Sequence, residues 1–365
     1  MKILQISPYA EPTVGGQERH VLALSETLAS LGHEVTILTC QPFSNTSQNF
    51  QVATINSVSL MGLRLVSPGD LIRFLLEKRF DVCHLHHQTL FGEIILLINR
   101  MCGLPTITTL HTLMLRRAPA RFIYDRLSLK VISTFSRRVV CLSRKIMQNL
   151  VGRGLESSKC VVIPNAVDLE TLRQKYREAC DQLREPWFDI LFVGRLEQRK
   201  GILWLLESLT LLQKKGRNYT LKIVGHGPLI GKIKDIISAN NLSQFVKVTG
   251  YLSQQDLLKC YLLSRVVVIP SFYEGVPTVA LEAMIANKPL VVSDIPGLSD
   301  LVLNESNGLV VNPMDTSGLA SAIDEVLSDS TRFNSLEAVN NKILPQFDWK
   351  VVARKIMRTY CEILN

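Results

Sequence analysis

Short apolar segments alternate with amphipathic stretches along almost the whole chain, and this alternation constrains the fold more than any other feature. Runs such as KILQIS, HEVTILTC and DVCHLHH are short and rich in β-branched residues, as buried strands are. Between the first two runs, GGQERHVLALSETLASLG places Val21, Leu24, Leu28 and Leu31 on one helical face, and Gly32 ends the helix. Such strand–helix–strand units predict parallel strand pairs in an α/β fold.

The series of strands and helices occurs twice. PTITTLH, RVVCLS and CVVIPN complete the first series, and six further strand candidates follow the charged stretch LRQKYREACDQLREP, which suits a helix and connector. The 365 residues suit two domains of ordinary size. We expect an N-terminal Rossmann-like domain over 1–170, a linker over 171–186, a C-terminal Rossmann-like domain over 187–345, and a helix over 346–365 that returns to the first domain. Doubly wound sheets bind ligands beyond the carboxyl ends of their strands, so two facing sheets predict an interdomain cleft.

Composition excludes several classes of protein. The chain is 47% hydrophobic and 20% charged, and no apolar run reaches the roughly 18 residues that cross a bilayer. The start, MKILQISPYAEP, has no signal-peptide pattern. Eight cysteines are scattered singly, which indicates free thiols in a reducing compartment. We therefore expect a cytoplasmic protein.

Positive charge is concentrated in the first half of the chain. Residues 1–182 carry 21 Lys and Arg against 14 Asp and Glu, and the whole chain has a net charge of +9. The most basic stretch is 112–138, in which Ile123, Leu127 and Val131 recur every four residues. This pattern suits either a contact with an anionic membrane surface or a solvated helix face above an ordinary core.

The usual ligand of a doubly wound sheet, a dinucleotide, lacks its fingerprint here. The first strand is followed by PYAEPTVGGQERH, which contains no GxGxxG, and the second strand ends in LTCQPF without an acidic residue for a ribose. No GxxxxGK[ST] phosphate loop occurs either. The sequence therefore disfavours a nicotinamide, flavin or P-loop enzyme.

Two other segments have the features of an anion site. FVGRLEQRKG places Arg195, Lys200 and Gly201 after a strand, where two cations and a glycine turn can bind a diphosphate. In SFYEGVPTVALEA, Glu274 leaves a strand and Glu282 lies about one turn inside the next helix, whose amino end favours phosphate. The alternative for the first segment is a solvated loop in which Glu197 neutralises its neighbours.

Taken together, these segments resemble glycosyltransferase family 4, a large retaining family with the GT-B fold. The resemblance covers nearly the whole chain, in the order GGQERHV, TLHT, VVIPNAVD, FVGRLEQRKG, VGHGP, VTGYL, PSFYEGVPTVALEA and a closing FDW…Y helix. The two glutamates separated by seven residues, with EGxP between them, are the most specific element. The family implies a retaining, metal-independent transfer of a sugar from a nucleotide-diphosphate sugar to a glycan or lipid-linked hydroxyl, with no cofactor and no nucleic acid, in envelope polysaccharide or glycolipid synthesis.

The resemblance also implies roles for individual residues. Glu274 would face the donor sugar, Glu282 would bind the ribose, and Arg195 and Lys200 would hold the phosphates. His111 would lie near the transferred sugar or the acceptor hydroxyl, or else cap its strand end through backbone bonds. The backbone around the donor would come from Gly16, Gly250, Tyr251, Gly275, Val276, Pro277 and Thr278.

Two further questions remain open in the sequence. CHLHHQT brings His84, His86 and His87 together, but no Cys or carboxylate cluster matches them, so we expect no metal. A non-catalytic nucleotide-sugar scaffold or sensor and a nucleotide-sugar epimerase are the rival functions on the same architecture. Intact Glu274, Glu282, Arg195, Lys200 and His111 disfavour the scaffold, and the glutamate spacing disfavours the epimerase.

Overall fold

The structure is a computed structural model that describes residues 1–7, 16–40, 49–60, 63–87, 89–111, 119–181, 183, 187–274, 277–303, 306–329 and 331–364. The chain forms two compact units. The first comprises Met1–Ala166 together with Trp349–Asn365, and the second comprises Val167–Asp348. Each unit is built on its own parallel sheet.

The first unit has a seven-stranded sheet in the order β3-β2-β1-β6-β7-β8-β9. Every strand pair in it is parallel. The strand order reverses beside β1, which pairs with β2 on one side and with β6 on the other. The strands are β1 (Lys2–Ile6), β2 (Glu34–Thr39), β3 (Gln51–Thr54), β6 (Val82–His87), β7 (Thr106–Leu110), β8 (Arg138–Cys141) and β9 (Cys160–Val162). A separate antiparallel pair is formed by β4 (Ser57–Leu60) and β5 (Leu63–Val66).

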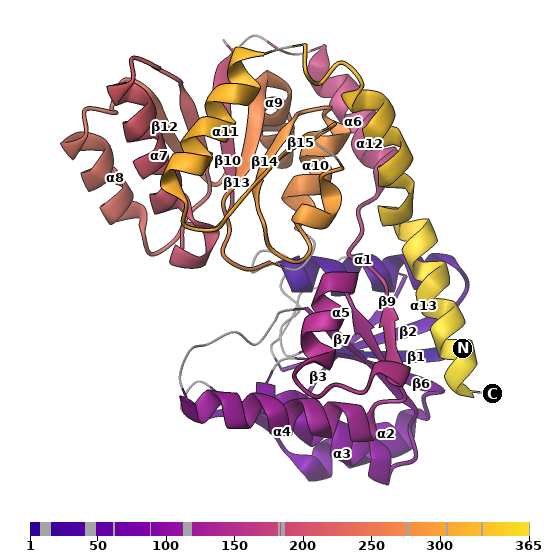
Figure 1. Ribbon diagram of the computed structural model, residues 1–365. Helices are drawn as coiled ribbons and strands as arrows, with labels where there is room; N and C mark the ends of the chain where they lie inside the picture. The colour runs from indigo at the N-terminus through magenta and orange to yellow at the C-terminus, as the bar shows by residue number, and fades with distance from the viewer. Residues whose placement is uncertain are drawn as a thin grey trace. The chain divides into compact units, whose positions relative to one another are not determined.

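Helices cover both faces of the first sheet (Figure 1). α1 (Gly16–Ser30) and α13 (Trp349–Leu364) pack on one face, where Val21, Leu24, Leu28 and Ile356 are buried. α2 (Pro68–Lys78), α3 (Thr89–Met101) and α4 (Pro119–Phe135) lie on the other face, and α5 (Arg144–Val151) leads to β9. Leu31 does not join the buried face of α1: it lies beyond the helix end and is 48% exposed.

The second unit has a six-stranded parallel sheet in the order β12-β11-β10-β13-β14-β15, with its reversal beside β10. Its core joins the sheet to α7, α8 and α11, while α6, α9 and α10 lie on the other face (Figure 1). The strands are β10 (Phe188–Val193), β11 (Leu221–Val224), β12 (Val246–Gly250), β13 (Ser264–Ile269), β14 (Leu290–Ser293) and β15 (Gly308–Val311). The helices are α6 (Leu169–Cys180), α7 (Ile202–Lys214), α8 (Ile230–Ala239), α9 (Gln254–Leu263), α10 (Thr278–Ile285), α11 (Thr316–Ser328) and α12 (Leu336–Ile343).

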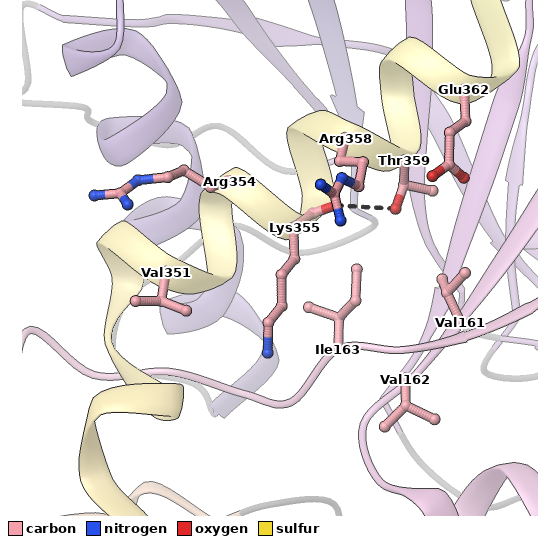
Figure 2. Close-up of a pocket in the computed structure, with 9 residues that line it drawn as sticks. All are labelled: Val161, Val162, Ile163, Val351, Arg354, Lys355, Arg358, Thr359 and Glu362. Atoms are coloured by element: carbon pink, nitrogen blue, oxygen red, sulfur yellow. Dashed lines mark hydrogen bonds between the residues drawn. The ribbon is translucent and has the colours of Figure 1, made fainter.

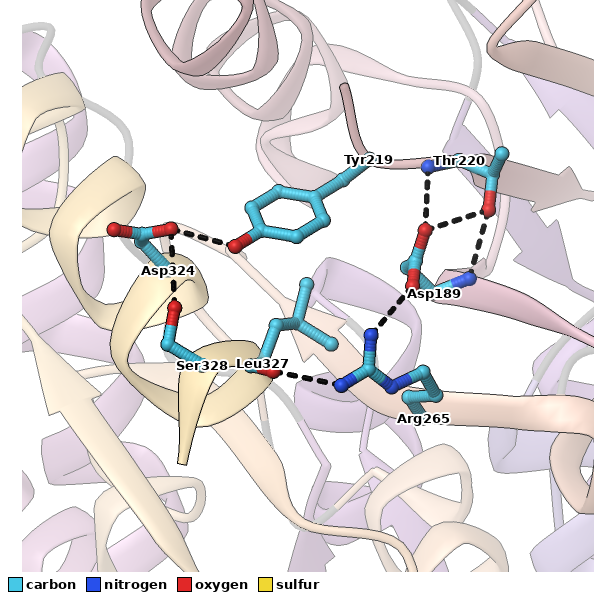
Figure 3. Close-up of polar contacts among 7 residues, drawn as sticks. All are labelled: Asp189, Tyr219, Thr220, Arg265, Asp324, Leu327 and Ser328. Carbon is cyan, nitrogen blue, oxygen red and sulfur yellow. Dashed lines mark hydrogen bonds and ion pairs between the residues drawn. The ribbon is translucent and has the colours of Figure 1, made fainter. Parts of the chain in front are cut away.

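A polar network ties the amino ends of these strands to α11 (Figure 3). Asp189 accepts hydrogen bonds from the backbone and the hydroxyl of Thr220, each at 2.9 Å, and pairs with Arg265 at 2.9 Å. Arg265 also donates to the carbonyl of Leu327 at 2.6 Å, so one guanidinium joins β10 to the end of α11. These contacts lie at the amino ends of the strands, which leaves the carboxyl ends for ligands.

The described strands and helices match the predicted series closely. All twelve predicted strands are present, and β3, β4 and β5 are additional. Residues 171–180, expected in a linker, lie inside α6, which begins at Leu169 and belongs to the second unit because Tyr176 and Ala179 are buried there. On α13, Val352, Ala353, Ile356 and Tyr360 are buried, and Val351 is half-buried.

Candidate functional site

Strand order alone indicates where each unit would bind a ligand. In open α/β sheets the crevice lies beyond the carboxyl ends of the strands, where the order reverses. In the second unit that place is formed by the segments that follow β10 and β13, which are FVGRLEQRKG and PSFYEG. In the first unit it lies at the carboxyl ends of β1 and β6.

The loop after β10 is held against the end of β13 through a glycine. Gly201 has φ +71°, and a Cβ there would lie 1.8 Å from the carbonyl oxygen of Pro270. The backbone N–H of Phe272 donates to the carbonyl of Arg199 at 2.8 Å. Only glycine therefore permits this turn, and the turn brings the cations of one segment beside the carboxylate of the other.

Glu274 is the centre of a charged cluster on this unit. Its side chain is 9% exposed and is paired with Lys200, and it accepts a hydrogen bond from Ser271 Oγ at 3.0 Å. Arg199 lies 3.7 Å from its other oxygen and also pairs with Glu197 at 2.6 Å. Glu197 therefore does neutralise a neighbour, as the alternative for this loop supposed, but that neighbour is Arg199. Arg195 is exposed and has no polar partner among the described residues.

Glu282 is oriented by two tyrosines. The hydroxyl of Tyr261, which is fully buried in α9, donates to Glu282 Oε2 at 2.7 Å. Tyr176 on α6 donates to the backbone carbonyl of Glu282 at 3.0 Å. Burial, and secondarily the nearby Glu282 carboxylate, raises the pKa of both tyrosines well above the ordinary value, so both remain neutral donors.

Glycines also join the loops near the predicted nucleotide base. A Cβ at Gly225 would lie 1.9 Å from the carbonyl oxygen of Gly194, and one at Gly227 would lie 2.5 Å from that of Leu196. These contacts explain the glycines of VGHGP by close backbone packing. Tyr251 follows Gly250, is 76% exposed, and stacks on His226 with ring centroids 5.8 Å apart.

The start of α10 completes the described part of the candidate donor site. Pro277 occupies the N-cap position and Thr278 is the first helical residue, with no side-chain cap. The first amides of a helix have no partner inside it, so they are available to an anion. Gly275 and Val276 lie outside the described residues, and their predicted contacts therefore remain predictions.

The first unit presents a cluster of imidazoles at the carboxyl end of its sheet. His111 is half-buried directly after β7, and its Nε2 lies 2.9 Å from Nδ1 of His86 at the end of β6. Nε2 of His86 lies 2.5 Å from Gln5 Oε1 on β1. His20, one turn into α1 after Gly16, has its ring centroid 4.8 Å from that of His111. No described atom lies within 4 Å of where a Gly16 Cβ would be, so the described protein does not itself require glycine there.

The four clustered histidines are neutral at ordinary pH. Burial lowers the pKa of His20 to about 4 and that of His84 to about 3. Burial and the neighbouring imidazoles lower the pKa of His86 and of His111 well below the ordinary value. Neutral imidazoles keep a lone pair, which can accept a hydroxyl proton or bind a metal ion.

A metal could be held by His20, His86 and His111, since one ring nitrogen of each lies within 4.8 Å of the others. Of the histidines in CHLHHQT, His86 belongs to this group and His84 does not, and the side chain of His87 lies outside the described part of the structure. His84 bonds instead to Tyr360 Oη at 2.8 Å and to Thr109 Oγ1 at 2.6 Å.

A separate hollow lies between β9 and α13 in the first unit (Figure 2). The long side chains of Arg354, Lys355 and Arg358 border it from α13. The other lining residues are Val161, Val162, Ile163, Val351, Thr359 and Glu362. None of the residues predicted to bind donor or acceptor belongs to this lining, so the hollow is not part of the candidate site.

Sequence reasoning missed Arg199, Tyr261 and His20. A signal existed for His20, because Gly16 and His20 are four residues apart and share one face of a helix. The spacing of residues in FVGRLEQRKG does not indicate which of its two arginines, Arg195 or Arg199, lies beside Glu274. Tyr261 lies in α9, far along the chain from Glu282, and no local pattern connects the two.

The basic stretch 112–138 is described from residue 119 onward. Residues 112–118 lie outside the described part of the chain. On α4, Arg126, Leu127 and Lys130 are exposed, and Leu127 is 58% exposed. None of the helices in the described part of the chain combines the length and the hydropathy that crossing a membrane requires.

Comparisons with known proteins agree with this architecture. The profile of the family described as Glycosyltransferase Family 4 matches residues 14–171, and that of Glycosyl transferases group 1 matches residues 181–342. Glycogen synthase of Mycobacterium tuberculosis is 27% identical, over 99% of this chain and 94% of that protein. Phosphatidyl-myo-inositol mannosyltransferase of the same species is 26% identical, over 99% and 96%. The crystal structure of HepE from Anabaena in complex with UDP has a TM-score of 0.83 at 18% identity, over 99% of this chain and 100% of that chain, and shows the shared GT-B fold.

Proposed function

Because the chain belongs to the glycosyltransferases of Family 4 and group 1, we propose that it transfers a sugar from a nucleotide-diphosphate sugar to a hydroxyl of a glycan or lipid-linked acceptor, with retention of the anomeric configuration and without a metal. The observation that carries the proposal is the cluster around Glu274. A buried carboxylate held by Lys200 and Ser271 lies beside the open amino end of a helix. The carboxylate of such a site can accept hydrogen bonds from sugar hydroxyls, and the lysine and the helix amides can donate hydrogen bonds to phosphates.

On the second unit, the donor would make contacts of three kinds. Arg195 and Lys200, with the first amides of α10, would hold the diphosphate. Glu282 would accept hydrogen bonds from the ribose. The base would lie by Gly250 and Tyr251, whose exposed ring already stacks on His226. The crystal structure of HepE in complex with UDP supports a nucleotide donor of this kind.

The chemistry depends on charge that develops on the departing β-phosphate. Lys200, Arg195 and the helix dipole would stabilise that charge more strongly in the transition state than in the ground state. A phosphate oxygen would take the acceptor proton on the same face of the sugar from which the nucleotide leaves. His111, neutral because burial lowers its pKa, would hydrogen-bond the transferred sugar or the acceptor hydroxyl.

A calorimetric panel of UDP-, GDP- and ADP-linked sugars tests the proposal. We expect one class to bind, and Glu282→Ala to bind it more weakly. Product analysis then separates the rivals: a transferase forms a glycoside with the anomeric configuration of the donor, an epimerase changes the free nucleotide sugar, and a scaffold changes nothing. No binding across the panel, with or without acceptors added, would contradict the donor site.

We further propose that the acceptor is presented at an anionic membrane surface in the synthesis of envelope polysaccharide or glycolipid. Exposed Leu127 between exposed Arg126 and Lys130 favours surface contact over core packing for this face of α4. Each basic residue near anionic lipid contributes about 1 kcal/mol. We expect pelleting with phosphatidylserine vesicles that falls as salt rises and is weakened by Arg126→Glu/Lys130→Glu. Equal pelleting with neutral vesicles would contradict the proposal.

A further inference from the structure

We propose that His20, His86 and His111 form a binding site for one borderline divalent transition-metal ion such as Zn²⁺. The three residues come from α1, the end of β6 and the residue after β7, and one ring nitrogen of each lies within 4.8 Å of the others. Imidazole nitrogens suit zinc, and three histidines with one open position form a known zinc ligand set. The arrangement exists only because the parallel strands bring their carboxyl ends to one edge of the sheet.

His20 provides the strongest evidence for the site. Its Nδ1 lies 2.8 Å from Asn165 Oδ1, and that oxygen also accepts the backbone N–H of Ala166 at 3.0 Å. The second bond fixes the orientation of the amide, so Nδ1 of His20 must carry the proton and donate it. Nε2 is then a lone pair, and it is buried without a hydrogen-bond partner among the described residues. A buried, unpartnered acceptor is costly, and a metal ion would satisfy it.

His86 has the same arrangement. Its Nε2 lies 2.5 Å from Gln5 Oε1, and with the Gln5 amide in this orientation Nε2 donates and Nδ1 keeps the lone pair. Metal-binding histidines almost always donate the other ring N–H to a carbonyl or carboxylate oxygen, which fixes the ring and its tautomer. Two of the three imidazoles therefore already have the supporting contacts of metal ligands.

His111 completes the set with a change of tautomer. Without an ion, its Nε2 lies 2.9 Å from Nδ1 of His86 and donates to that lone pair. When an ion binds, the proton moves to Nδ1 of His111, which is half-buried at the strand end, and Nε2 becomes the third ligand.

The distances suit an ion after small side-chain shifts. Zinc–nitrogen bonds of about 2.0–2.1 Å in a tetrahedron place ligand atoms about 3.3 Å apart. The observed separations, from 2.9 Å for His86 and His111 up to 4.8 Å within the triad, bracket this value. His84 stacks on His86 with centroids 4.4 Å apart, but both of its nitrogens are bonded to Thr109 and Tyr360, so it is not a ligand.

Occupancy would have a functional consequence that rests on the proposed transfer reaction. The ion would take up His111, the residue assigned to the sugar or the acceptor hydroxyl. We therefore expect Zn²⁺ to inhibit transfer and a chelator to restore it. Metal binding itself is measured without donor or acceptor, so failure of the transferase proposal and failure of the metal site are distinguishable.

The test uses the full chain, freed of any affinity tag and of metal by dialysis against a chelator. Zn²⁺ is titrated by calorimetry, and Co²⁺ by its visible absorption, which reports four-coordinate geometry. We expect one ion per chain. Gln5→Leu removes only the supporting contact of His86 and should weaken binding by roughly 10–100-fold. His111→Ala removes a ligand at a half-buried strand end and should weaken it further.

Two more variants separate this site from adventitious binding. His33→Ala is the matched control, since His33 lies 3.5 Å from the amino group of Met1, a pair that could itself capture an ion. His33→Ala should bind as the unaltered chain does, whereas His20→Gln should not. Circular dichroism and the urea midpoint verify that each variant is folded. Absence of binding, or binding that survives both His111→Ala and His20→Gln, would overturn the inference.

Discussion

The two glutamates of the candidate donor site are held by different kinds of partner. Glu274 is nearly buried and compensated by Lys200, Arg199 and Ser271. Glu282 is half-buried, and Tyr261 holds one of its oxygens from the protein interior. A buried charge needs hydrogen-bond or ion-pair partners with good geometry. The partners that each carboxylate already has therefore determine which of its oxygen lone pairs remain available to a ligand.

At Lys200 we expect alanine to lower turnover by roughly a hundredfold or more. In the proposed mechanism, the substitution removes a cation that would stabilise developing phosphate charge, and such a loss typically costs about 2.7–4 kcal/mol. It also leaves Glu274 with fewer partners. Steady-state kinetics with saturating donor measure the effect. Lys232→Ala, at an exposed lysine of α8, is the control and should keep normal turnover; near-normal turnover of Lys200→Ala would show that the phosphate contact is misassigned.

At Tyr261 we expect phenylalanine to weaken nucleotide binding about tenfold. The hydroxyl donates to Glu282, the proposed ribose ligand, and its loss removes one charge-assisted hydrogen bond at 2.7 Å. Calorimetry with the preferred nucleotide and with its 2′-deoxy analogue measures the effect. The preference for ribose over deoxyribose should shrink in Tyr261→Phe.

Tyr176→Phe is the matched control for this prediction. It removes a hydroxyl that bonds only the backbone carbonyl of Glu282, so the preference for ribose should persist. An equal loss of ribose preference in both variants would point to a general loosening of α10. No loss in either would show that Tyr261 does not orient Glu282 for the ribose.

Loops at the carboxyl ends of the second sheet are joined by close backbone contacts at glycine. Gly201 lies against Pro270, Gly225 against Gly194, and Gly227 against Leu196. These contacts hold the segments after β10, β11 and β13 in one arrangement. The glycines thus permit the close packing of these loops.

For the glycine contacts between these loops, we expect a substitution to lower the free energy of unfolding. Gly201→Ala combines a left-handed backbone with a Cβ that would lie only 1.8 Å from Pro270 O. The backbone alone costs about 1–2 kcal/mol, and backbone shifts that relieve overpacking cost a further 1–3 kcal/mol, roughly. Urea denaturation followed by fluorescence measures the change. Gly216→Ala is the matched control, since Gly216 has φ +78° with nothing within 4 Å; equal destabilisation by both would show that the contact with Pro270 is unimportant.

In the first unit, buried histidines link the sheet to the end of the chain. His84 on β6 bonds Tyr360 of α13, and His20 packs on Trp349 with centroids 4.9 Å apart. The last residues of the chain therefore contribute to the first unit, although α6 to α12 intervene in sequence. The stability of this unit should depend on the protonation of these buried groups.

Acid should destabilise the first unit in a defined pH range. The pKa of His84 is about 3 and that of His20 about 4 in the folded chain, against 6.5 when unfolded. Below pH 6.5 the unfolded chain binds more protons, so stability is full above this pH and falls as pH drops toward 4. Each histidine contributes about 1.4 kcal/mol per pH unit in that range. Urea midpoints between pH 7.5 and 5 measure it, and a midpoint that is constant over this range would contradict the prediction.

Local patterns in the sequence were sufficient to predict the fold class and to select candidate donor-site residues. Period-two and helical patterns involve neighbouring residues, so the twelve predicted strands and the helices that follow them could be identified segment by segment. The glutamates at 274 and 282 and the cations at 195 and 200 lie in short segments, so the resemblance of those segments to a known family could select them as candidates. Boundaries were predicted less well, because residues 171–180 belong to a packed helix in which Tyr176 is buried.

Contacts between distant residues could be found only in the folded chain. The pairing of Tyr261 with Glu282, the contact of Gly201 with Pro270 and the triad of His20, His86 and His111 all join segments that are far apart along the chain. Such contacts depend on strand order, because the order decides which carboxyl ends are neighbours. A motif records what residues lie in one segment, whereas the order of strands in the sheet determines which segments share a site.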